Sequence, residues 1–155
     1  MTLTFENETE VEVDSDAILA QAQFLLAALC LHPQTEMSIT LVSTGDMEEL
    51  HLEWMQEPGA TDILSFPMDE LRPSDDPQPG MLGDIVICPE FVQADPDRAG
   101  LSMRERLEFL LVHGMLHLIG YDHATQEDYD AMFAFQDELL QQWQLAGGPV
   151  GGDRG

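Results

Sequence analysis

The stretch LEFLLVHGMLHLIGYDH, residues 107–123, predicts a nearly all-apolar helix that carries two histidines and ends in a turn with a third. Ser102 and Glu105 precede it with the spacing of a capping box, a common start of a helix. Gly120 can adopt the left-handed backbone that ends many helices, so the helix should run through Ile119. The fold is therefore expected to place a site on a long helix and the turn that follows it.

The three histidines of this stretch have the spacing of a metal site. His113 and His117 lie one helical turn apart, so both rings project from one face within reach of a single ion. The turn after Gly120 can bring His123 back toward the helix end. Three neutral imidazoles leave a fourth position for water, which is typical of catalytic zinc sites. The alternative is three ordinary core or surface histidines, but buried imidazoles are costly unless a partner holds their lone pairs.

Gly114 lies inside the predicted helix, where a glycine costs about 1 kcal/mol relative to alanine. A backbone or ligand passing close to the helix would explain it. The residue also occupies the position of the glutamate that acts as general base in zinc peptidases with the HExxH motif. The chain keeps the spacing HxxxHxxGxxH without that glutamate, so peptidase chemistry would lose its usual proton shuttle.

The rest of the pattern predicts a single domain of the α+β or α/β class over residues 1–146, with about four strands and four to five helices. Strands are expected at residues 2–6, 36–43, 63–66 and from 81 onward, the last of them central. Further helices are expected at 16–31 with Ser15 as cap, at 44–56 with Thr44 as cap, from Pro89, and from Thr125 to about Leu145. The glycine-rich tail, 147–155, should be disordered.

The chain is strongly acidic, with 30 acids against five arginines and a formal net charge of −25. Phosphate contacts supply most of the affinity of a free-standing nucleic-acid binder, so this charge argues against such a partner. Genome bias or a saline cytoplasm would also produce an acid-rich chain. No signal peptide and no apolar run of membrane-spanning length is visible, so a cytoplasmic protein without a membrane partner is expected. Cys30 and Cys88 are expected to be buried free thiols.

Three segments resemble the YbeY family of metal-dependent endoribonucleases. HGMLHLIGYDH is similar to the family signature HGxLHLxGYDH, and TDILSFP (61–67) and LGDIVIC (82–88) follow the family pattern in the right order. The resemblance covers roughly residues 36–140. It implies a single α+β domain with a mostly parallel or mixed four-stranded sheet. It also implies one zinc ion held by His113, His117 and His123, and hydrolysis of single-stranded RNA with a metal-bound water as nucleophile.

The resemblance further implies a place in ribosome biogenesis. The expected roles are maturation of the 16S rRNA 3′ end and ribosome quality control, with ribosomal RNA and the small ribosomal subunit as partners. Many members carry an arginine before TDxLSFP that contributes to cleavage, whereas this chain has Met55 there, so that role is not carried over. Docking on an assembled ribosomal particle would supply contacts that the charge of the chain does not. A monomer is expected.

Four further residues are candidates for the site. Thr61 and Ser65 can line a substrate cleft, although Thr61 can equally cap a turn and Ser65 can simply fill a strand. Asp84 can orient a ligand histidine or act as a base, and its alternative is a turn carboxylate at a strand entrance. Asp122 is expected to fix the turn rather than to titrate. Asp84 and Asp122 are the catalytic candidates beyond the metal-bound water.

Three alternatives stay open from the sequence. Imidazole also suits nickel, copper, iron and other divalent transition metals, so the ion need not be zinc. The protein can be another zinc hydrolase such as a peptidase, against which Gly114 speaks. It can also be a metal-stabilised ribosome assembly factor without catalytic activity.

Overall fold

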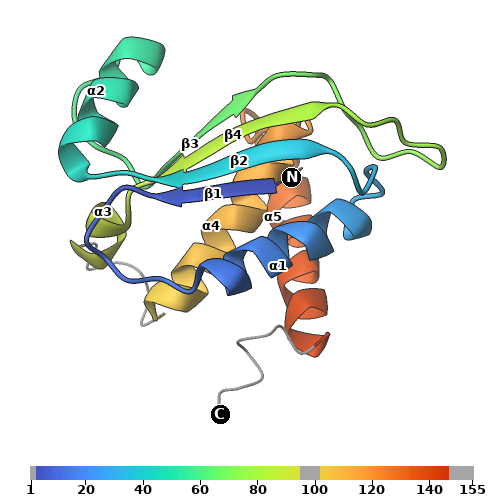
Figure 1. The fold of residues 1–155 in the computed structure, drawn as a ribbon. Coiled ribbons are helices and arrows are strands. Elements are labelled where there is room, and N and C mark those ends of the chain that lie inside the picture. The colour runs from blue at the N-terminus through green and yellow to red at the C-terminus, as the bar shows by residue number, and fades with distance from the viewer. Residues whose placement is uncertain (1–2, 95–101, 147–155) are drawn as a thin grey trace.

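Within residues 3–94 and 102–146, which the computed structural model describes, a four-stranded sheet forms the centre of the fold (Figure 1). Its strands are β1 (Leu3–Asn7), β2 (Glu36–Leu41), β3 (Ile63–Pro67) and β4 (Met81–Ile87). They lie in the order β1-β2-β4-β3, with β1/β2 and β2/β4 parallel and β3/β4 antiparallel. The predicted α+β class and mixed sheet are confirmed.

Strand β4 is central, as its apolar sequence predicted. Ile85 and Ile87 belong to the main core, whereas Val86 belongs to a smaller cluster on the opposite face. A strand buried on both faces needs apolar side chains in both directions, which explains the nearly unbroken apolar run.

Gly83 marks an irregularity in β4. The register between β4 and β2 shifts here and leaves Leu82 as an extra residue. Gly83 has a φ of +150°, and a Cβ at this position would collide with the carbonyl oxygen of Phe66 on β3. Glycine is therefore required where the two strands approach. The extra residue changes the face taken by the side chains that follow it.

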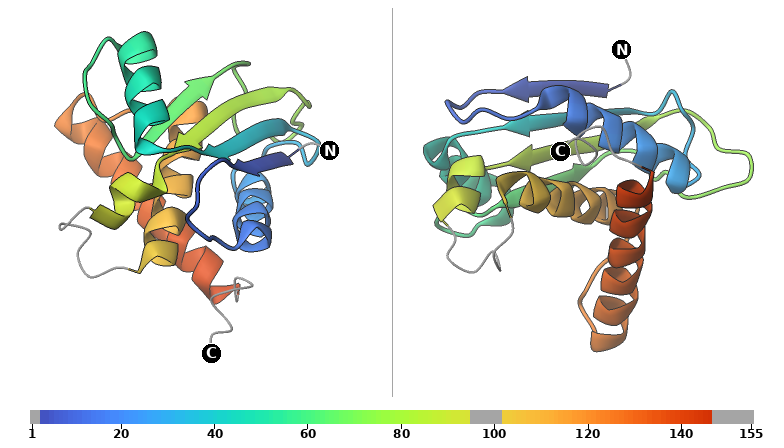
Figure 2. Two further views of the ribbon diagram at one scale, coloured as in Figure 1. Left: turned by 60° about the vertical axis from the view of Figure 1, so that its left-hand side comes forward. Right: turned by 90° about the horizontal axis from the view of Figure 1, so that it is seen from below.

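The described part of the chain contains five helices. They are α1 (Ser15–Ala28), α2 (Thr44–Met55), α3 (Pro89–Ala94), α4 (Met103–Leu118) and α5 (Gln126–Leu145). Figures 1 and 2 show α1, α4 and α5 on one face of the sheet and α2 at one end of the other face. Helix α4 contacts β3, β4, α1 and α5, so the histidine-bearing helix lies at the centre of the packing.

The start of α4 is the predicted capping box. Ser102 Oγ accepts from the Glu105 N–H at 3.1 Å, and Glu105 Oε1 accepts from the Ser102 N–H at 2.9 Å. These two bonds satisfy backbone donors that have no partner inside the helix, and they fix where α4 begins.

The end of α4 reverses the chain, as Gly120 predicted. The Gly120 N–H donates to the His117 carbonyl and the Tyr121 N–H to the Leu116 carbonyl, each at 3.0 Å. Gly120 has a φ of +102°, in the region that favours glycine. The pair of bonds is a Schellman arrangement, which turns the following residues back along the helix.

Three details of the predicted elements are wrong. Helix α1 is capped by Asp14 rather than by Ser15, and α2 by Ser43 rather than by Thr44. In both cases two good capping residues are neighbours, and the one that precedes the first helical residue caps the helix. Helix α1 also ends before the predicted residue 31, because Cys30 takes a left-handed backbone with a φ of 56°. The Cys30 thiol is exposed rather than buried.

The remaining predictions concern the second cysteine, the C-terminal tail and membrane-spanning helices. Cys88 is buried and free, as expected. The predicted disordered tail, 147–155, lies outside the described residues. None of the helices that the structure describes is both long and apolar enough to cross a membrane.

Candidate metal centre

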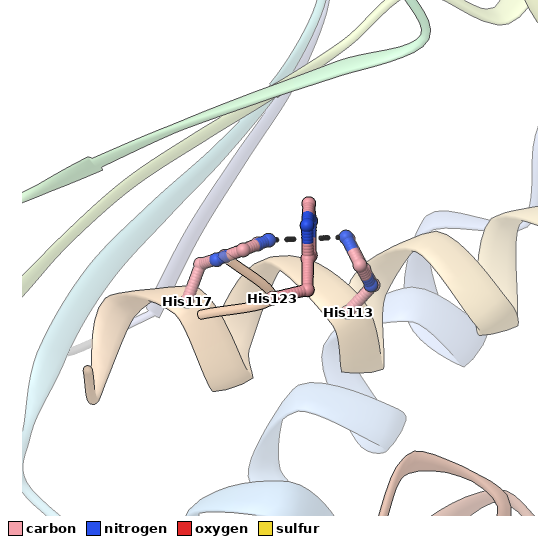
Figure 3. A group of neighbouring side chains, drawn as sticks. All are labelled: His113, His117 and His123. Carbon is pink, nitrogen blue, oxygen red and sulfur yellow. Dashed lines mark hydrogen bonds between the residues drawn. The ribbon is translucent and has the colours of Figure 1, made fainter. Parts of the chain in front are cut away.

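His113, His117 and His123 come together as the sequence predicted (Figure 3). Helix α4 carries the first two, and the turn after it brings His123 to the same face. One ring nitrogen from each histidine lies within 4.8 Å of the other two. The Nε2 atoms of His113 and His117 are 3.1 Å apart. The His123 side chain is exposed and the other two are partly buried, so the cluster is open on one side.

The two helical histidines are oriented by their Nδ1 atoms. His117 Nδ1 lies 3.0 Å from the Tyr121 carbonyl oxygen, which can only accept, so this nitrogen carries the proton. His113 Nδ1 donates in the same way to Gln136 Oε1 at 2.9 Å. A neutral ring protonated at Nδ1 keeps a bare lone pair at Nε2. Two lone pairs therefore face each other between His113 and His117.

This arrangement fits a metal ion better than a proton. A shared proton would make one ring an imidazolium, but burial lowers the pKa of both His113 and His117. Positive charge on His113 would lower the pKa of His117 further. In a tetrahedral zinc site with bonds of about 2.0–2.1 Å, two ligand nitrogens lie about 3.3 Å apart. The spacing, the lone pairs and the third ring match that donor set, as well as other ions that favour imidazole.

A cleft of about 430 Å³ opens beside the histidines. Its opposite wall is β3 and the residue before it, with Asp62 and Ser65 among the lining side chains. Ser65 therefore lies where the sequence predicted, and its Oγ donates to the Gly114 carbonyl at 3.4 Å. Thr61 does not line the cleft, and its hydroxyl donates to Asp62 Oδ1 at 3.4 Å. A substrate can reach the histidines between β3 and the end of α4.

Gly114 is explained by the contact between α4 and the sheet. A Cβ at this position would come within 2.9 Å of Ile63 Cδ1 and within 3.2 Å of Ile85 Cδ1 and Ser65 Oγ. The glycine lets α4 lie close against β3 and β4. A glutamate here would point into these side chains, so the centre has no room for the base that follows the first histidine in zinc peptidases.

Residues 3–144 match the family model described as Endoribonuclease YbeY. The chain belongs to the YbeY endoribonuclease family. Two relatives named Endoribonuclease YbeY, from Thermobifida fusca (strain YX) and Acidothermus cellulolyticus, are each 46% identical to it. The matches span 147 residues, 93% of this chain and 95% of the first relative, and 160 residues, 96% of this chain and 98% of the second.

A solved structure supports the fold of this YbeY member. The solution structure of TM1509 from Thermotoga maritima matches it with a TM-score of 0.57 at 20% sequence identity. The match covers 99% of each chain, so the same arrangement of sheet and helices extends over the whole domain.

Asp84 lies away from the histidine cluster of this YbeY member, so it does not stand beside one of these histidines as predicted. It lines a groove on the opposite face of the sheet, where Ser38 Oγ donates to Asp84 Oδ1 at 2.6 Å. The irregularity at Gly83 is the reason. Leu82 faces the main core, and strict alternation would put Asp84 on that face as well.

Two other positions singled out from YbeY-like motifs have structural places. Asp122 fixes the turn, because its Oδ1 accepts from the His123 N–H at 2.7 Å and so holds the backbone of the third histidine of the cluster. Met55 is the last residue of α2, and its side chain is exposed outside the cleft. Neither side chain supplies a group to the cleft wall.

Sequence reasoning missed Gln136 and Asp62. Gln136 is fully buried on the inward face of α5, between Met132 and Leu139. A glutamine on an apolar stripe needs a polar partner, and this was the available signal. Asp62 lines the cleft and pairs with Arg106 Nη2 at 3.2 Å, a contact across 44 residues that no local pattern reveals.

Gln136→Met should weaken metal binding by about 10- to 100-fold, the usual effect of losing the partner that orients a ligand histidine. Methionine keeps the volume of the buried side chain but removes the oxygen that accepts from His113. Competition against a chromophoric chelator measures the affinity. Gln142→Met, on the exposed side of the same helix, is the control and should bind like wild type. Equal affinities for both variants would show that Gln136 does not orient the ligand.

Proposed function

We propose that the protein is a zinc-dependent endoribonuclease that cleaves single-stranded RNA. One observation carries the proposal: two fixed Nε2 lone pairs, 3.1 Å apart, face an open cleft together with a third histidine. The name of its relatives, Endoribonuclease YbeY, supplies the reaction. We also propose that it acts as a cytoplasmic monomer on ribosomal RNA and the small ribosomal subunit. Its roles there would be 16S rRNA 3′ end maturation and ribosome quality control, in line with the motif resemblance.

The side chains around the cleft support hydrolysis of a phosphodiester. His113, His117 and His123 would hold a divalent ion, which would supply a water of lowered pKa and would offset charge on the phosphate oxygens. Asp62 presents a carboxylate at the cleft wall, where it can accept a proton. Arg106 pairs with Asp62 and places a positive charge behind it, with the guanidinium 4.7 Å from the centre of the Phe109 ring. We therefore assign proton transfer to Asp62 in place of Asp84.

The net charge of −25 sets a condition on the substrate. An acidic surface repels free RNA, and few arginines are present to form phosphate contacts. An assembled small-subunit particle would supply contacts of its own. Cleavage of small-subunit particles should therefore be faster than cleavage of the same RNA without protein. Equal rates would count against docking on the particle.

The deciding experiment is cleavage of a labelled single-stranded RNA by protein purified without a histidine tag. Cleavage should stop when a chelator removes the metal and return when zinc is added. Elemental analysis of the untreated protein identifies the ion. A peptide library should stay uncut, because Gly114 leaves no room for the peptidase base. RNA cleavage that persists in metal-free protein would overturn the proposal.

Acid should release the ion, because imidazoles bind metals only when neutral. Burial lowers the pKa of His113 and His117 below the ordinary imidazole value of about 6.5. Both rings therefore remain neutral at that pH and take up protons only below it. Metal content should hold at a pH of about 6.5 and be lost by a pH of about 4.5.

The lowered pKa values of His113 and His117 also determine whether the folded state gains or loses stability as the pH falls. Unfolded imidazoles take up protons at a higher pH than the folded ones, so the folded state loses stability as the pH falls below about 6.5.

Elemental analysis after gel filtration at each pH measures the metal content. An unchanged content at a pH of about 4.5 would contradict the assignment of neutral imidazole ligands.

A further inference from the structure

Two aromatic side chains of α5 continue the histidine cluster. The Tyr129 and Phe133 rings stack with centroids 4.4 Å apart and planes at 29°. The Phe133 ring lies 5.6 Å from the ring of His113 and 6.4 Å from that of His123. Tyr129 lies 6.4 Å from His123. An aromatic surface thus runs from two ligand imidazoles out along α5.

Core packing does not explain this aromatic pair. Tyr129 is 45% exposed. Neither ring is among the described side chains that pack against the two hydrophobic clusters. Phe135 on the same helix behaves differently, since it packs on the main core and lies 5.6 Å from Tyr121. Tyr129 is exposed and Phe133 is partly buried, and aromatic rings so placed beside a reaction site are suited to binding a ligand through a ring face.

We propose that Tyr129 and Phe133 form a stacking platform for an unpaired base next to the scissile phosphate. The proposal rests on the proposed function and deepens it, because the platform then selects single strands. In a duplex each base is already stacked between its neighbours, whereas an unpaired base can lie on an aromatic ring. The exposed edge of the platform is Tyr129, and its inner end touches the rings that would hold the ion.

The charge of the chain favours this mode of binding. Phosphate contacts need cations, and the chain has 30 acids against five arginines. Stacking needs no charge and accepts any base, because every base has a π-face. The aromatic pair therefore gives this acidic protein RNA affinity that does not depend on charge, next to the histidines where the strand would be cleaved.

Binding of a short single-stranded RNA that carries 2-aminopurine tests the platform. Phosphorothioate linkages keep the backbone charge and slow hydrolysis, so the metal-loaded full chain can be used. Wild type should quench the fluorescence of the probe on binding. Tyr129→Leu and Phe133→Leu should weaken binding about 5- to 100-fold and lose the quenching. Tyr129→Phe keeps the ring and should behave like wild type.

Salt dependence separates stacking from lost phosphate contacts. The slope of log affinity against log salt should be the same in Tyr129→Leu and wild type, because stacking releases no counterions. Loss of one phosphate contact to a single strand would instead reduce the slope by about 0.7. The ratio of single-strand to duplex cleavage should also fall in the leucine variants.

The outcomes distinguish the platform from the proposed function. Lost affinity at an unchanged slope, with Tyr129→Phe intact, supports the platform. Wild-type binding by Tyr129→Leu, or a loss with a changed slope, overturns it even while wild type still cleaves RNA. Tyr129 is exposed, so the melting temperature of its variants should stay near that of wild type and confirm that they fold. A wild-type protein that cleaves neither single-stranded RNA nor small-subunit particles would overturn the proposed function and the platform with it.

Discussion

His117→Ala should abolish metal binding and RNA cleavage while the domain stays folded. The substitution removes one of the two fixed Nε2 lone pairs, so His113 and the exposed His123 are left to hold the ion alone. Loss of a group that hydrogen-bonds to a ligand histidine lowers metal affinity or activity about 10- to 100-fold. Loss of the ligand itself should therefore lower kcat/KM at least about 1,000-fold. Elemental analysis and cleavage of labelled single-stranded RNA measure the two effects.

The control for this substitution is His32→Ala, a histidine outside the cluster that should keep both properties. Binding to small-subunit particles and the biological effect are measured alongside. A folded, particle-bound His117→Ala that keeps its biological effect would show that catalysis is not needed. The protein would then be a metal-stabilised assembly factor, and the endoribonuclease proposal would be wrong.

Gly114→Glu should destabilise the domain strongly rather than create a peptidase. The new side chain would push against Ile63 and Ile85 on the sheet, where the Cβ alone comes within 2.9 Å of a side-chain atom. It would also bury a carboxylate among apolar groups. Overpacking and an unpaired buried charge together should cost at least about 3 kcal/mol of unfolding free energy. Chemical denaturation measures the loss.

Two variants make the interpretation of Gly114→Glu specific. Gly114→Ala adds only the Cβ, whose nearest neighbours are the ends of side chains that can shift, so it should cost far less. Ala134→Glu places the same carboxylate on the exposed side of α5 and should be close to neutral. A stable Gly114→Glu that hydrolyses peptides would show that this position faces the cleft and not the sheet.

Local patterns predicted the elements and the clustering of the three histidines well. The helix period placed His113 and His117 on one face, and the capping box and Gly120 fixed the ends of α4. These features depend on residues within a few positions of each other, so a sequence contains all the information they need. The same is true of the apolar run that made β4 central.

Asp84 is an example of a feature that local sequence patterns do not predict. Its face depends on the extra residue at Gly83, and that irregularity arises from the pairing of β4 with two other strands. Gln136 and Asp62 depend on contacts across 23 and 44 residues, made when α5 and β3 pack against α4. Such contacts belong to the tertiary fold, and the only local trace was a glutamine on an apolar helix face.

The Schellman turn links the end of α4 to the occupancy of the cluster. The carbonyl of His117 accepts from the Gly120 N–H, and the ring of the same residue donates to the Tyr121 carbonyl. Fraying of this turn would release the ring that presents the lone pair, so an ion that binds only the closed turn suppresses fraying by mass action. Hydrogen exchange at the amides of Gly120 and Tyr121 would then slow when the ion binds, so the exchange rate would report how much of the cluster is occupied.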